Sequence, residues 1–80
     1  MAVGQFAQAF AEILQSLGLS ATKFASQLED RRMAQKNAAV DGISKASVLA
    51  YTKGERLPSG ETFLFMFEQL RENALATEQQ

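Results

Sequence analysis

The segment from Gly42 to Ser59, GISKASVLAYTKGERLPS, constrains the fold most, because it marks both ends of one short helix. Ser44 is a favourable N-cap, since its hydroxyl can accept a hydrogen bond from the first free backbone N–H groups. Gly54 can adopt the left-handed conformation that ends a helix, and Pro58 prevents the helix from continuing. The sequence therefore predicts a helix from Lys45 to Lys53.

Similar signals predict three further helices. Apolar residues recur at helical spacing from Gln5 to Leu17, and Gly18 can end that first helix. Ser20 is a good N-cap for a second helix, and Ser59 is a good N-cap for a fourth. We expect the fourth helix to run from Gly60 to about Ala74.

No strand pattern appears, so the chain is predicted to be all-α. With 80 residues and 46% hydrophobic residues, it can form one compact four-helix domain, which we place at residues 1–75. We expect residues 76–80 to be a disordered tail. The longest apolar run, Phe63–Phe67, is too short to cross a bilayer, and the N-terminus does not read as a secretory signal. These features predict a cytoplasmic protein without a membrane partner.

The residue types argue against an enzyme or a metalloprotein. The chain has no cysteine, so it has no thiolate nucleophile or thiolate metal ligand, and it has no histidine, which removes the commonest general base and metal ligand. The neighbouring carboxylates Glu29 and Asp30 diverge by about 100° on a helix, so they do not form a catalytic pair. We therefore expect no catalytic site and no cofactor.

Charge is distributed unevenly along the chain, although the net charge is only −1. The stretch from Arg31 to Arg56 holds six basic and two acidic residues, whereas the remainder holds two basic and seven acidic residues. A chain polarised in this way can present a positive face to a polyanion despite its nearly neutral total.

Residues 29–41, EDRRMAQKNAAVD, contain helix-forming residues and neither glycine nor proline. The weaker helix formers gather late in this segment. We expect the second helix to continue to about Lys36 and to be followed by a loop, and a separate short helix is the alternative.

Two blocks of the sequence carry a family resemblance. The pattern Leu19-Ser20-x-x-x-Phe24-Ala25-x-x-Leu28 resembles the second helix of the lambda-repressor-like, or Cro/XRE-type, helix-turn-helix family. The run from Gly42 to Leu70 resembles the turn, recognition helix, loop and fourth helix of that family. The chain departs from the family in the extra residues 29–41, where members usually have a short turn. It also has Thr52 where members often have glutamate.

The resemblance implies a sequence-specific DNA-binding transcriptional regulator, expected to be a repressor, that reads the major groove with helix 45–53. Its partners would be double-stranded DNA and a second copy in a homodimer. The alternative is a helix-turn-helix module for protein contact, or the N-terminal domain of a larger regulator, with little base specificity of its own.

A helical wheel assigns roles within helix 45–53. Val48, Tyr51 and Thr52 share the side expected to face the core. The opposite side is the expected reading face, and the resemblance adds the loop that follows as a phosphate contact. The expected DNA-binding residues of this region are Ser44, Lys45, Ala46, Ser47, Leu49, Ala50, Lys53 and Arg56. Lys45 can donate to guanine, whereas the apolar members can only contact thymine methyl groups.

The extra segment adds three candidate DNA-binding residues, Arg31, Arg32 and Lys36. On a helix Arg32 and Lys36 share one face, which can follow the phosphate backbone or a narrow minor groove. In the alternative interpretation the segment is a solvated helix extension, and its arginines pair with Glu29 and Asp30.

The fourth helix suggests a partner surface. Phe63, Met66, Phe67 and Leu70 cluster on one side, which we expect to face the core. Phe65 lies about 200° from Phe63, so the wheel predicts an exposed aromatic that a second copy would cover, flanked by Leu64 and Leu75.

Overall fold

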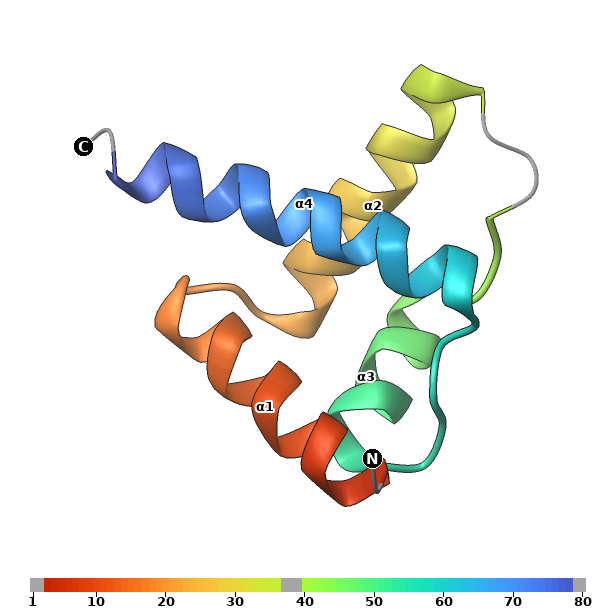
Figure 1. The fold of residues 1–80 in the computed structure, drawn as a ribbon. Helices are drawn as coiled ribbons and strands as arrows, with labels where there is room; N and C mark the ends of the chain where they lie inside the picture. The colour runs from red at the N-terminus through yellow and green to blue at the C-terminus, as the bar shows by residue number, and fades with distance from the viewer. Residues whose placement is uncertain (1–2, 37–39, 79–80) are drawn as a thin grey trace.

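The structure is a computed structural model that describes residues 3–36 and 40–78. These residues form four helices and no strand: α1 Val3–Ser16, α2 Ala21–Gln35, α3 Lys45–Lys53 and α4 Gly60–Glu78. The predicted all-α, four-helix class is confirmed. Figure 1 shows α4 crossing α2, and α3 lies against both α1 and α2.

The connection between α1 and α2 follows its local signals. Gly18 has a φ of 70°, and the backbone N–H of Leu19 donates to the carbonyl of Leu14 at 2.9 Å. Ser20 then caps α2, because its hydroxyl accepts a hydrogen bond from the backbone N–H of Lys23 at 3.1 Å.

Helix α3 has both of its predicted ends. The hydroxyl of Ser44 accepts a hydrogen bond from the backbone N–H of Ser47 at 3.2 Å. Gly54 has a φ of 78°, and the backbone N–H of Glu55 donates to the carbonyl of Ala50 at 2.9 Å. The predicted bounds Lys45–Lys53 are confirmed.

The hydrophobic core draws on all four helices and on the loop that precedes α3. Phe24, Leu28 and Val48 have no exposed surface. The rings of Phe10 and Phe24 meet edge to face with their centroids 5.8 Å apart, which joins α1 to α2. The buried cluster comprises Phe10, Leu14, Phe24, Ala25, Leu28, Val40, Ile43, Val48, Tyr51, Phe65 and Met66.

The loop before α3 is held by two hydrogen bonds from different helices. The hydroxyl of Tyr51 in α3 donates to the carbonyl of Gly42 at 2.7 Å. The hydroxyl of Thr62 in α4 donates to the carbonyl of Asp41 at 2.8 Å. Val40 and Ile43 on either side are buried in the core. This loop therefore fixes where α3 begins relative to α4.

Helix α2 continues beyond the segment that carries the family resemblance. It ends at Gln35, and Lys36 caps it in the left-handed conformation with a φ of 53°. The prediction that helix 2 continues to about Lys36 is confirmed, and residues 29–36 form no separate helix. The remainder of the predicted loop includes residues 37–39, which lie outside the described residues.

The predicted inward side of α4 is wrong in part. Phe65 is buried with 4% of its surface exposed, whereas Phe63 and Phe67 expose 43% and 56%. The buried side of α4 instead includes two polar residues, Thr62 and Gln69. A wheel that ranks residues by hydrophobicity misses a buried side that contains polar residues. Phe65 is therefore unavailable as a partner surface.

Helix α4 is longer than predicted, because it continues to Glu78 instead of ending near Ala74. Residues 76–78, expected in the tail, are helical, and residues 79–80 lie outside the described part of the chain. None of the described helices combines the length and the apolar character needed to cross a membrane.

The Tyr51–Gly42 contact leads to a prediction. Gly42 has a φ of 68°, and a Cβ atom there would lie 2.7 Å from the Tyr51 hydroxyl, while nothing lies within 4 Å of a Cβ at Gly18. Gly18→Ala should lower the free energy of unfolding by about 1–2 kcal/mol for the left-handed backbone alone. Gly42→Ala should cost at least about 1 kcal/mol more, because it also displaces a buried hydrogen-bond donor. Urea unfolding of both variants, measured by circular dichroism, tests this, and equal losses would contradict it.

Candidate nucleic-acid interface

Helix α3 has one buried side and one open side. Val48 and Tyr51 are buried, with exposed fractions of 0% and 1%. Lys45, Ala46 and Lys53 are exposed, and Leu49 and Ala50 are half-buried. The open side therefore contains the four residues that the wheel assigned to the reading face or its flank, together with Lys53, which the resemblance assigned to phosphate contact. We call Lys45, Ala46, Leu49, Ala50 and Lys53 the α3 face.

The α3 face carries a positive charge at each end and methyl groups between them. Lys45 and Lys53 are eight residues apart, which corresponds to about 12 Å along the helix axis. An ammonium group can donate to phosphate oxygens or to guanine, whereas methyl groups can contact thymine. The face can thus bind a polyanion, but it has no polar reading group between the two lysines.

A second group surrounds the N-terminus of α3. The hydroxyls of Ser44 and Ser47 lie 3.1 Å apart, and the Arg56 guanidinium donates to Ser47 Oγ at 3.3 Å. The guanidinium also lies over the Tyr51 ring, 5.9 Å from its centroid. Ser47 was expected to bind DNA, which requires an accessible hydroxyl, but only 7% of the residue is exposed. The expectation of an accessible Ser47 is wrong because the loop after α3 places Arg56 against that edge.

Arg31 is directed toward α4. Its guanidinium lies 3.2 Å from Glu68 and 2.8 Å from Glu72, and it sits over the Phe65 ring at 5.8 Å from the centroid. Donation to Glu72, and then to Glu68, raises the pKa of the Arg31 guanidinium, although burial opposes the shift. We call these contacts the Arg31 bridge. The alternative interpretation paired Arg31 with Glu29 or Asp30, and this is wrong, because its partners are Glu68 and Glu72.

The other two cations of the α2 extension differ from Arg31. Arg32 Nη2 lies 2.7 Å from Glu29 Oε1, one helical turn earlier, and this hydrogen bond lowers the pKa of Glu29. This local pair was the predicted alternative, and it is confirmed for Arg32. Lys36 is exposed at the C-terminus of α2.

The structure therefore divides the predicted site residues into three groups: the α3 face, the Ser44–Ser47–Arg56 cluster and the α2 extension. Four cations of the basic stretch form no ion pair with any described residue, namely Lys36, Lys45, Lys53 and Arg56. Local sequence signals could not reveal the Arg31 bridge, because its carboxylates lie 37 and 41 positions further along the chain.

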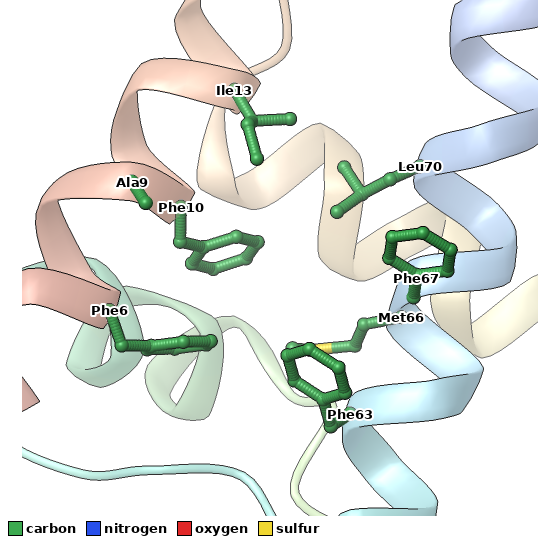
Figure 2. A pocket seen from close by; sticks show the side chains of 8 residues that line it. All are labelled: Phe6, Ala9, Phe10, Ile13, Phe63, Met66, Phe67 and Leu70. Carbon is green, nitrogen blue, oxygen red and sulfur yellow. The ribbon is translucent and has the colours of Figure 1, made fainter. Parts of the chain in front are cut away.

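A further surface feature is an apolar groove between α1 and α4, which the sequence did not predict. Its volume is about 190 Å³. Figure 2 shows the two helices contributing opposite walls, with the rings of Phe6 and Phe63 directed toward each other. The α1–α4 groove is lined by Phe6, Ala9, Phe10, Ile13, Phe63, Met66, Phe67 and Leu70.

Comparison with known proteins found no matching family model, and no curated protein or solved structure matched the chain significantly. In residues 3–36 and 40–78, no cluster of three acidic, histidine or cysteine side chains could hold a metal ion.

Tyr51 is predicted to make stability depend on pH at high pH. Burial raises its pKa above the ordinary value of about 10, Asp41 adds to this shift, and Arg56 opposes it. The stability that Tyr51 contributes should therefore be complete below pH 10 and be lost as the pH rises through the folded-state pKa. Because the chain has one tyrosine and no tryptophan, tyrosinate absorbance reports this group alone. Tyr51→Phe should remove this part of the pH dependence, and an unshifted titration of the folded wild type would contradict the prediction.

The Arg31 bridge leads to a second prediction, with a matched arginine as control. Arg31→Ala should lower the free energy of unfolding by about 1–3 kcal/mol, because charged hydrogen bonds and the packing over Phe65 are lost together. Arg32→Ala removes only a local pair on the surface and should leave the urea midpoint nearly unchanged. Equal midpoints for the two variants would show that the bridge does not stabilise the fold.

Proposed function

We propose that this chain is a helix-turn-helix DNA-binding domain of a cytoplasmic transcriptional regulator, acting as a repressor, that places α3 in the major groove. The observation that carries the proposal is the α3 face. This face lies on a short helix with both ends capped, it carries a positive charge at each end, and the opposite side of the helix packs on the hydrophobic core. A helix of nine residues has the dimensions that fit a major groove.

The roles follow from position on α3. Lys45 lies in the first turn and would contact a guanine edge, while Ala46 and Leu49 set the approach of the helix to thymine methyl groups. Lys53 at the opposite end would contact a phosphate. Arg56 would contact a second phosphate, and its hydrogen bond to Ser47, next to the Ser44 cap, would hold its guanidinium in place.

The α2 extension contributes less to this interface than the sequence suggested. Lys36 is exposed and Arg32 is half-exposed, so both can lie along the phosphate backbone. Arg31 has only 15% of its side chain exposed and already has two carboxylate partners, and we leave it out of the proposed interface.

A homodimer completes the proposal, because regulators of this kind bind two half-sites related by a two-fold axis. The dimer surface cannot include Phe65, which is buried.

The second candidate is a module whose main partner is a protein. The observation that favours it is the lack of polar groups between Lys45 and Lys53, which limits base discrimination. Such a module would bind duplex DNA weakly and without sequence preference.

The test is a salt series with duplexes selected from a random pool. Affinity of the wild type should fall steeply with salt, and Lys53→Ala should lower the slope of log K against log salt by roughly 0.9, whereas Lys53→Arg should keep it. Lys45→Ala should reduce discrimination between selected and random duplexes by about 1–3 kcal/mol. Affinity that responds neither to salt nor to these substitutions would exclude the proposal and favour the protein-binding candidate.

A further inference from the structure

The outer side of α4 carries exposed residues at alternating spacings of four and three. These are Gly60, Leu64, Phe67 and Arg71, which we call the outer stripe of α4. Alternation of four and three is the pattern by which one helix follows another along a common seam. The stripe therefore has the geometry of a helix-pairing surface.

The centre of the outer stripe is apolar and open to solvent. Leu64 exposes 64% of its surface and Phe67 exposes 56%. Phe67 also lines the α1–α4 groove, so the stripe continues into the exposed parts of Phe63 and Ile13 (Figure 2). At roughly 150–200 Å² for each complete side chain, these four residues leave roughly 300–400 Å² of apolar surface in water. A patch of that size is often functional.

The ends of the outer stripe carry opposite charges. Arg71 lies at one end, and Glu61 lies beside Gly60 at the other. Neither forms an ion pair with a described residue. If two copies of α4 ran parallel, each charge would face its own equivalent. If they ran antiparallel, each charge would face the opposite one, so the stripe is complementary to itself.

One antiparallel register pairs all four residues of the outer stripe with residues of the same stripe in the other copy. In an antiparallel pair the numbers of two facing positions have a constant sum, and here that sum is 131 both for positions 64 and 67 and for positions 60 and 71. Leu64 of each copy then faces Phe67 of the other, and Gly60 faces Arg71. A Cβ at Gly60 would have nothing within 4 Å, so the backbone there leaves room for the arginine stem, and the neighbouring Glu61 can accept from its guanidinium.

We propose that a second copy of this chain docks on the outer stripe of α4, with the two α4 helices antiparallel and Leu64 against Phe67 in both directions. The apolar area per copy is roughly half of the 800 Å² or so that each partner buries in a standard interface. The dimer is accordingly weak and in exchange with the monomer. This surface rests on the homodimer that the proposed function includes. Because the dimer is tested without DNA, the dimer surface and the DNA-binding function can each fail independently.

The first experiment measures mass against concentration by sedimentation equilibrium. The wild type should shift from 8.8 kDa toward twice that mass as the concentration rises to about 1 mM. Leu64→Asp should raise the dissociation constant at least about tenfold, because it places a carboxylate in the seam. Leu75→Asp is the matched control, since Leu75 is a half-exposed leucine of the same helix outside the paired segment. A wild type that stays monomeric, or equal effects of the two variants, would overturn the proposal.

The second experiment tests the antiparallel direction. The chain has no cysteine, so a single introduced cysteine is the only site for a short bifunctional maleimide. In the proposed register the two copies of position 64 are offset by about 4.5 Å along the axis, and the two copies of position 75 by about 28 Å. Leu64→Cys should therefore cross-link, and Leu75→Cys should not. Cross-linking of both at equal rates would indicate parallel helices and overturn the register.

Charge reversal provides an independent check of the same register. Arg71→Glu and Glu61→Arg should each weaken the dimer, and the double variant should recover wild-type affinity, because each copy again meets an opposite charge. A double variant weaker than either single one would overturn the pairing of Glu61 with Arg71.

Discussion

The hydrogen bond from the Tyr51 hydroxyl to the Gly42 carbonyl is the contact on which the remainder of the structure depends. It is 2.7 Å long and part-buried, and it connects the last turn of α3 to the loop that precedes this helix. Thr62 holds the adjacent carbonyl of Asp41 from α4. Because the two bonds come from different helices, they orient α3 and α4 together. The α3 face keeps its direction only while this loop keeps its conformation.

A second constraint is the contact between α2 and the buried side of α4. The Arg31 bridge places the extension of α2 across α4 and covers Phe65. Once Phe65 is inside, Phe63 and Phe67 must lie on the outer sides of α4, toward α1 and solvent. The α1–α4 groove and the outer stripe of α4 therefore include aromatic side chains that point away from Phe65. The same bridge removes Arg31 from the positive stretch that the sequence suggested for DNA contact.

The two proposed surfaces use different chemistry. The α3 face has ammonium groups at its ends and would gain affinity from counterion release, so it should respond strongly to salt. The outer stripe of α4 is apolar at its centre and depends mainly on removing Leu64 and Phe67 from water, so it should respond weakly. The salt dependence of affinity should therefore distinguish the proposed DNA binding from the proposed dimerisation.

The sequence by itself determined the helices and most of their ends, because these depend on contacts within a few residues. Ser20, Ser44 and the glycines at 18 and 54 act through the backbone next to them. It also located most of the α3 face, since Val48 and Tyr51 share one side of α3 and both are buried. It did not determine the buried side of α4, because α4 has aromatic residues on two opposite sides and polar residues on its core side. On that buried side Phe65 contacts Arg31 of another helix, and Thr62 donates to Asp41 in a distant loop. Only the tertiary structure brings those groups to α4, and so only it could decide that Phe65 is buried and Phe67 is open.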